Sequence, residues 1–432
     1  MQSICTPALG YKQRARGLSF YGGAKLLLAM RLLLEVSSYA SDWPQFLGPT
    51  RNGIYGGADL SEQWPKEGPP PRWQKKVGAG FSGPIVASGK LILFHRLDNK
   101  ETIDCLDAQS GQVLWSFNYV TAYRDDFGFD EGPRATPAMD QGRVYTYGAE
   151  GMLHCLDLQN GKKLWSIDTK REFHAAKGFF GIACSPFVES TLLILNVGGR
   201  DGAGIVAFDK TNGKVLWKTT EDEASYSSPT VATLEGRRCD LVLTRGRLVG
   251  LQPEDGKLLF QFPFRPPISS SVSAAVPLVI NDKLFLSASY GTGAAVLQIK
   301  DNSLRRLWES DEAISAHYAT PVHYQGFLYG IHGRVDPGYD PTLRCIELAS
   351  GKLMWEQKLS AATVTLADKT LLILTERGEL IRAAASSTGF RETGRAQILP
   401  NQVRAHPALA NGLFYARSKD KLVCVDLGKK SN

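Results

Sequence analysis

The fold is decided by the stretch Cys155-Leu156-Asp157-Leu158-Gln159-Asn160-Gly161-Lys162-Lys163-Leu164-Trp165. It has the pattern of a short strand, a tight polar turn and a second strand that ends in Trp. The same unit recurs at Cys105–Trp115, Ala207–Trp217 and Cys345–Trp355, and a weaker copy ends at Phe260. A repeat of short strands with a period of roughly 40–50 residues is typical of a propeller or a solenoid.

Two markers in the repeat can be counted independently. The first is the Trp of the outer strand or its substitute, at Trp73, Trp115, Trp165, Trp217, Phe260, Trp308, Trp355 and a degenerate position near Phe390. The second is a Pro that begins an inner strand, at Pro84, Pro137, Pro186, Pro229, Pro277, Pro321, a degenerate Thr363-Val364 and Pro407. Because each marker occurs eight times, we predict an all-β, eight-bladed β-propeller of four-stranded blades. Seven blades are the alternative if residues 355–405 do not form a full blade.

The two ends of the repeat region complement each other. The last copy, Leu422–Leu427, stops before any Gly-Lys-x-Leu-Trp strand, and the first Trp strand, at Trp73, has no repeat before it. We therefore expect the N- and C-terminal strands to pair and to complete the eighth blade. Such pairing leaves no open sheet edge.

Two further repeated features are expected to be structural. An acid (Asp107, Asp157, Asp209 or Glu347) precedes the turn in each good copy, where its side chain can accept turn amides. The equivalent cysteines, at Cys105, Cys155, Cys345 and Cys424, are expected to be small buried apolar side chains. The chain has no C-x-x-C and no vicinal cysteine pair, so neither a metal knuckle nor a redox pair is indicated.

The chain divides into three predicted parts: a signal segment (1–40), an N-terminal extended arm (41–70) and the propeller (71–428). Basic residues, an apolar run around Leu32–Leu34 and the small-residue site Ser38-Tyr39-Ala40 indicate export to the periplasm or another extracytoplasmic space. Arg31 and Glu35 interrupt this pattern, and a shorter leader that starts at Met30 is an alternative. Without residues 1–40 the formal net charge falls from +7 to +3. This small positive charge does not indicate nucleic-acid binding. No other stretch is long and apolar enough to span a membrane.

The repeats resemble those of the pyrroloquinoline quinone (PQQ)-like propeller family, whose blades carry Ala/Cys-Leu-Asp-x-x-(Ser/Thr/Asn)-Gly-Lys-x-Leu-Trp. The resemblance covers about residues 71–428, and the arm Trp43–Gly53 resembles that of a secreted bacterial subgroup of PQQ-binding-like propellers. It implies that each outer Trp docks against the turn of a neighbouring blade. The family contains quinoprotein alcohol and sugar dehydrogenases, which hold PQQ and Ca²⁺ on the ring axis. It also contains non-catalytic propellers such as BamB of the outer-membrane assembly machinery, so the fold does not decide the function.

We expect the candidate site on the ring axis, where the loops from each outer strand to the next inner strand gather. The ligand- or partner-binding candidates in this axial funnel are Arg134, Lys177, Ser227, His317, Tyr318, Arg404 and His406. Such a ring of basic side chains can bind an anion, for example a quinone carboxylate or an acidic peptide. The alternative is a water-filled funnel whose side chains satisfy one another. His317 and Tyr318 stand out because His can titrate near neutral pH.

The sequence favours a binding role over catalysis. No calcium ligand set can be matched residue by residue, and no catalytic residue or metal site can be assigned. The acidic loop Asp125–Glu131 offers four oxygen donors, but its spacing matches no calcium loop, so a solvated loop is favoured. We interpret the chain as an exported scaffold for an envelope protein or a small ligand. A PQQ-dependent dehydrogenase of an alcohol or sugar, with PQQ and Ca²⁺ as cofactors, is the alternative.

Overall fold

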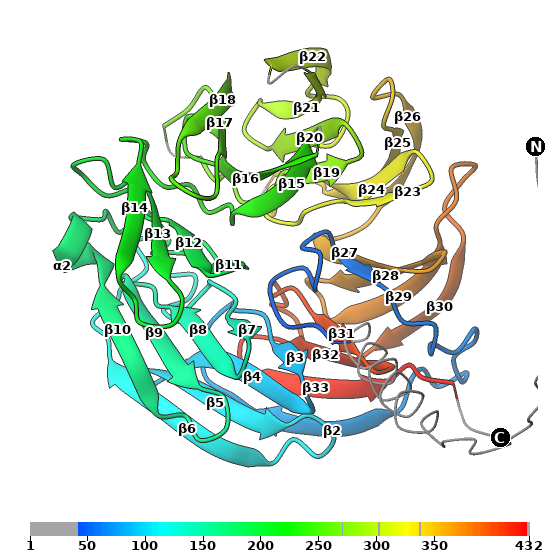
Figure 1. Ribbon diagram of the computed structural model, residues 1–432. Helices are drawn as coiled ribbons and strands as arrows, with labels where there is room; N and C mark the ends of the chain where they lie inside the picture. Colours follow the sequence, from blue (N-terminus) through cyan, green and yellow to red (C-terminus); the bar gives the residue numbers. More distant parts are fainter. Residues whose placement is uncertain (1–41, 235, 270, 301–302, 337, 430–432) are drawn as a thin grey trace, which may run out of the picture. The chain divides into compact units, whose positions relative to one another are not determined.

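The computed structural model describes residues 42–234, 236–269, 271–300, 303–336 and 338–429. The predicted signal segment (1–40) lies outside the described residues. Eight sheets, each with four antiparallel strands, follow one another around a ring (Figure 1). The prediction of an eight-bladed β-propeller is therefore confirmed. No helix in the described ranges is long and apolar enough to cross a membrane.

The first four blades run from the inner to the outer strand in chain order. Blade 1 consists of β3 (Ile85–Ala87), β4 (Lys90–Leu97), β5 (Lys100–Asp107) and β6 (Val113–Val120). Blade 2 consists of β7 (Ala138–Asp140), β8 (Arg143–Tyr147), β9 (Met152–Asp157) and β10 (Lys163–Asp168), and the short helix α2 (Thr169–Phe173) follows it. Blade 3 consists of β11 (Phe187–Glu189), β12 (Leu192–Asn196), β13 (Ile205–Asp209) and β14 (Val215–Thr219). Blade 4 consists of β15 (Thr230–Leu234), β16 (Arg237–Leu243), β17 (Arg247–Leu251) and β18 (Leu258–Pro263).

The other four blades continue the ring. Blade 5 consists of β19 (Leu278–Ile280), β20 (Lys283–Ala288), β21 (Gly293–Lys300) and β22 (Ser303–Ser310). Blade 6 consists of β23 (Val322–Tyr324), β24 (Phe327–His332), β25 (Thr342–Glu347) and β26 (Leu353–Lys358). Blade 7 consists of β27 (Ala362–Ala367), β28 (Thr370–Thr375), β29 (Glu379–Ala384) and β30 (Glu392–Gln397), with β1 (Ile54–Tyr55) as a fifth strand. Blade 8 consists of β31 (Ala408–Ala410), β32 (Leu413–Arg417), β33 (Lys421–Asp426) and, outermost, β2 (Pro71–Lys76).

Both ends of the chain build blade 8. Strand β2 pairs antiparallel with β33, and Trp73 lies opposite Cys424. The predicted closure by N- and C-terminal strands is therefore confirmed. Strands β27–β30 form a complete blade within residues 355–405, which excludes the seven-blade alternative.

The apolar core lies between neighbouring blades. For example, Ile92 and Cys105 of blade 1 share one cluster with Val144 and Leu156 of blade 2. The middle strands are buried on both faces for this reason, whereas the outer strand β6 alternates between buried and exposed positions. All six described cysteines are free and buried, as expected for Cys105, Cys155, Cys345 and Cys424.

The outer Trp of one blade packs against the turn of the next blade. The indole Nε1 of Trp115 donates to the carbonyl oxygen of Leu158 at 3.0 Å, and its ring covers Gly161. A Cβ at Gly161 would lie 2.6 Å from that ring, and the residue has φ +72°. Glycine is therefore needed at this turn both for its backbone conformation and for the close approach of the indole. The carboxylate of Asp157 accepts the backbone N–H of Gln159 at 2.9 Å, as predicted for the repeated acids.

Blade 7 departs from this pattern. Its outer strand β30 has Gly394 at the position that Trp or Phe260 occupies elsewhere, and Gly394 lies opposite Arg382. The expectation of a degenerate outer position near Phe390 needs correction, because Phe390 lies in the turn and packs against Trp355 of blade 6 (centroids 5.9 Å apart). Trp64 of the N-terminal segment covers Gly394 instead, since a Cβ there would lie 3.0 Å from its ring.

The N-terminal segment crosses the ring from blade to blade. The backbone of Trp43 exchanges two hydrogen bonds with Val86 of blade 1. Arg51 donates to the carbonyl oxygen of Pro186 in blade 3 at 3.2 Å. Strand β1 then pairs parallel with β27 of blade 7. Because these partners belong to or precede inner strands on different sides of the ring, the segment lies over the ring axis (Figure 1).

Candidate functional site

A cavity of about 180 Å³ that opens to the surface lies on the ring axis, at the face where the predicted loops gather. Seven phenylalanine and tyrosine side chains line it: Phe46, Phe81, Phe129, Phe180, Tyr226, Tyr290 and Tyr318. Phe46 comes from the N-terminal segment and the other rings come from the propeller. Both the propeller and the N-terminal segment that crosses the ring therefore contribute residues to the cavity wall.

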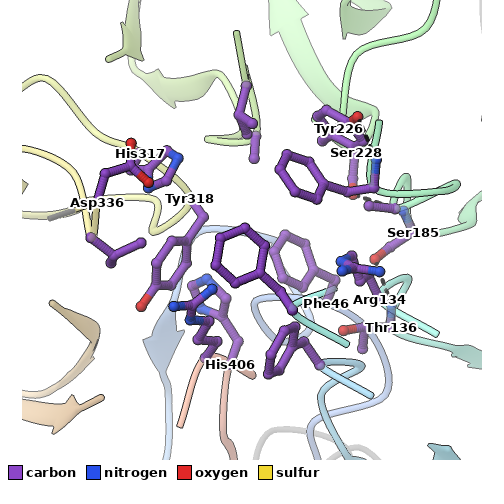
Figure 2. A pocket seen from close by; sticks show the side chains of 18 of the residues that line it. Phe46, Arg134, Thr136, Ser185, Tyr226, Ser228, His317, Tyr318, Asp336 and His406 are labelled. Carbon is purple, nitrogen blue, oxygen red and sulfur yellow. Dashed lines mark hydrogen bonds between the residues drawn. The ribbon is translucent and has the colours of Figure 1, made fainter. Parts of the chain in front are cut away.

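The structure brings five of the seven candidate residues to this cavity: Arg134, His317, Tyr318, Arg404 and His406. Figure 2 shows His317, Tyr318 and His406 on one side and Arg134 on the other. Lys177 and Ser227 do not line it. Lys177 pairs with Asp126 at 2.5 Å on the outer rim, and the buried hydroxyl of Ser227 donates to the carbonyl oxygen of Ala275 at 2.9 Å.

A repeated spacing places the cavity residues. In five blades the residue three positions before the Pro of the inner strand lines the cavity. These residues are Phe81, Arg134, Tyr226, Tyr318 and Arg404. The residue directly before the Pro also faces the axis where it is Thr136, Ser185, Ser228 or His406. The sequence pattern was not used to find Phe81, although this spacing could have found it. Phe46 was not predicted either, because the repeat carries no signal for it.

Hydroxyl groups join adjacent blades around one arc of the cavity. The Thr136 hydroxyl accepts the backbone N–H of Gly83 at 3.1 Å. The Ser185 hydroxyl accepts that of Thr136 at 2.9 Å, and the Ser228 hydroxyl accepts that of Ser185 at 2.9 Å. These bonds fix the loops at the axis, so the cavity wall is held by the propeller itself.

Arg134 forms an ion pair with the buried Asp125. Its Nη2 donates to the buried carboxylate of Asp125 at 2.7 Å, and its Nη1 donates to the Tyr123 hydroxyl at 3.2 Å. Burial alone would raise the pKa of Asp125, but hydrogen bonds from the backbone N–H of Phe127 and Asp130, together with Arg134, lower it. The expectation of a solvated acidic loop is therefore wrong for Asp125, which anchors the loop.

Arg404 is less constrained. Its Nε donates to Glu376 at 2.6 Å, and both side chains are about a quarter exposed. Its guanidinium lies 5.5 Å from the ring centre of Phe81 and 5.4 Å from that of Phe129. Within the described residues, its terminal nitrogens Nη1 and Nη2 donate no hydrogen bond. Arg404 can therefore bind an added carboxylate.

Three buried polar atoms of the wall have no hydrogen-bond partner among the described residues: His317 Nδ1, Tyr318 Oη and His406 Nε2. The other ring nitrogen of His317 lies 3.0 Å from the Tyr290 hydroxyl. Burial lowers the pKa of both histidines to about 4, so both are neutral at physiological pH. The expectation that His317 titrates near neutral pH is therefore wrong. An unpaired buried polar atom is costly to stability, so these three atoms mark an unsatisfied part of the wall.

The residues present do not fit a calcium-bound quinone. Ca²⁺ takes about six to eight oxygen ligands. Among the acids of the described cavity wall, Asp336 pairs with Arg334 at 3.0 Å, and the nearby Glu376 pairs with Arg404. No group of three or more potential metal-ligating side chains was found in the described ranges. The cavity of about 180 Å³ is also smaller than the roughly 300–1,000 Å³ typical of pockets for drug-sized ligands.

Comparisons with known proteins agree with the fold. The family model described as outer membrane protein assembly factor BamB matches residues 99–336. BamB from Moraxella catarrhalis has 14% sequence identity and a TM-score of 0.59, over 84% of this chain and 99% of that chain. A quinohemoprotein alcohol dehydrogenase from Comamonas testosteroni has 14% identity and a TM-score of 0.63, over 93% of this chain and 83% of that chain. A europium-containing methanol dehydrogenase has 11% identity and a TM-score of 0.52, over 91% of each chain. No curated protein matches the sequence. At these identities the solved structures indicate a shared fold alone.

Proposed function

Because the chain belongs to the family of the outer membrane protein assembly factor BamB, we propose that it is an exported binding scaffold of the cell envelope. Its binding site is the axial cavity, and its ligand is an envelope protein or a small molecule. The observation that carries this proposal is a preformed aromatic cavity whose wall includes His317, Tyr318 and His406, three residues that each hold a buried polar atom without a hydrogen-bond partner among the described residues. Pockets with mostly apolar walls and a few convergent polar groups are typical binding sites.

The composition of the wall supports binding over catalysis. The two arginines are each paired with a carboxylate, and both histidines are kept neutral by burial. A general base needs a pKa near the working pH, and neither histidine meets that condition. The wall instead offers hydrogen bonds and aromatic surface, which serve recognition.

The proposal is tested by retention of envelope components on purified, immobilised protein. Wild type is compared with Tyr318→Phe and Arg404→Gln, which alter the cavity, and with Arg395→Gln as a control on the outer strand of blade 7. We expect a component that wild type and the control retain and that both cavity variants lose. Equal retention by all four proteins, each shown to be folded by thermal unfolding, would overturn the cavity as the binding site.

A further inference from the structure

Four phenylalanines on two neighbouring loops cluster beside the axial cavity, and we call them the phenylalanine mouth: Phe127, Phe129, Phe179 and Phe180. The side chains of Phe127 and Phe129 are 55% and 46% exposed. The ring centres of Phe127 and Phe180 lie 5.1 Å apart, and those of Phe129 and Phe180 lie 6.1 Å apart. A contiguous patch of exposed aromatic rings is unusual on a soluble domain and marks an interaction surface.

The mouth and the cavity form one continuous apolar surface. Phe129 and Phe180 belong to both, because they line the cavity and also touch Phe127. A ligand confined to the cavity would leave Phe127 and Phe179 uncovered. The ligand that fits the whole surface therefore extends beyond the cavity, as a polypeptide does when one side chain inserts and its neighbours lie across the rim.

The mouth is held in place before anything binds. The loop that carries Phe127 and Phe129 is anchored by the buried pair Asp125–Arg134. In the second loop, the backbone N–H of Phe180 donates to the Tyr226 hydroxyl at 3.1 Å. A surface that is already ordered avoids part of the entropy cost of association.

The charges around the mouth are balanced in pairs. Arg124 pairs with Glu131 at 3.1 Å, Lys177 with Asp126 at 2.5 Å, and Arg245 with Glu223 at 3.1 Å. An anionic membrane surface is recognised by an excess of Lys and Arg, which these pairs do not provide. A polar, charge-balanced rim around an apolar centre is the usual anatomy of a protein–protein interface.

The chain itself places in this cavity an aromatic side chain from a turn outside the repeats. Phe46 of the N-terminal segment lines it and packs edge-on against His406, with ring centres 4.9 Å apart. Arg404, at the junction of cavity and mouth, has terminal nitrogens that are free for a carboxylate within the described residues. We propose that the partner is a polypeptide segment that inserts an aromatic side chain into the axial cavity and places an adjacent carboxylate on Arg404. This inference rests on the proposed function and names its partner class.

The test uses a fluorescein-labelled pentapeptide with a central phenylalanine between two aspartates, and fluorescence anisotropy of the purified protein. We expect binding that falls at least about tenfold when the peptide phenylalanine becomes alanine, or in the variant Phe127→Ser with Phe179→Ser. Arg404→Gln is expected to weaken the aspartate peptide about tenfold and to leave a peptide with asparagines unchanged. The matched control is Leu114→Ser with Leu216→Ser, which removes two side chains of 50% and 51% exposure from outer strands.

Two outcomes would overturn the inference. One is binding of phosphatidylglycerol vesicles through the mouth without binding of any peptide, which would make the surface a membrane contact. The other is peptide binding that the mouth variant and the control affect equally. If no peptide binds but an envelope component is still retained in a cavity-dependent way, the inference falls and the proposed function stands. If no peptide binds and no envelope component is retained through the cavity, both the inference and the proposed function are wrong.

Discussion

At the scale of single residues, Asp240 is out of place in a propeller core. Its strand register places it where the other seven blades have Leu91, Val144, Leu193, Leu284, Leu328, Leu371 and Phe414. Both of its carboxylate oxygens are buried without a hydrogen-bond partner among the described residues. Burial, followed by the charge of Glu189, raises its pKa from 3.8 to about 8.

This shift predicts a pH dependence of stability. The unfolded chain releases the Asp240 proton near pH 4, whereas the folded chain keeps it until about pH 8. The free energy of unfolding therefore falls as pH rises from 4 to 8, by on the order of a few kcal/mol. Asp240→Asn is expected to remove this part of the slope, as measured by urea unfolding at pH 5 and pH 8. An unchanged slope would contradict the assignment.

The two arginines of the cavity differ in what they hold. Arg134→Ala leaves the buried carboxylate of Asp125 without its partner, and we expect it to lower the free energy of unfolding by about 3 kcal/mol or more. Arg404→Ala removes a pair that is about a quarter exposed, and we expect a loss below about 1 kcal/mol. Urea unfolding of both variants measures the difference. Equal losses would show that the Asp125–Arg134 pair is not the anchor of the loop.

At the scale of elements, the ring depends on the contact between an outer Trp and the next turn. Gly161→Ala would bring a Cβ to 2.6 Å from Trp115, at φ +72°. Gly142 is a matched control, because its φ is +76° but a Cβ there would meet nothing within 4 Å. We expect Gly161→Ala to lower the free energy of unfolding by about 1–3 kcal/mol more than Gly142→Ala, since only the first overpacks the indole. Thermal unfolding of the two variants measures this difference. Equal effects would show that the contact between Trp115 and the turn at Gly161 does not stabilise the ring.

At the scale of the whole molecule, the repeat made the architecture predictable. The turn glycines and the Pro markers are local signals with local causes, so eight blades and their closure could be counted from the sequence. The degenerate blade 7 was harder, because Trp64 reaches Gly394 from a distant part of the chain. Local patterns do not record such a contact.

The candidate site was only partly predictable for the same reason. Side chains alternate direction along an extended loop, so Ser228 faces the cavity while its neighbour Ser227 does not. Phe46 enters the site from a segment outside the repeat, and Asp125 is buried by a tertiary ion pair. The histidine pKa values depend on burial, which the sequence pattern does not quantify.

The quinoprotein alternative gives a further prediction at this scale. Purified protein titrated with PQQ and Ca²⁺ is expected to show neither stoichiometric changes in quinone absorbance nor dye-linked oxidation of alcohols. The physical reason is that the acids near the cavity are paired with arginines and its volume is about 180 Å³. Stoichiometric binding with dye reduction would make the cavity an active site.

The central claim, that a partner docks at the axial cavity, is tested most directly by site-specific photo-cross-linking in envelope extracts. A benzophenone amino acid replaces Phe129 at the opening of the cavity or, as a control, Leu114 on an outer strand, side chains of 46% and 50% exposure. We predict a discrete cross-linked protein from position 129 that is missing at position 114 and lost with Arg404→Gln. Cross-links from position 114 alone, or equal cross-links from both positions, would contradict the account.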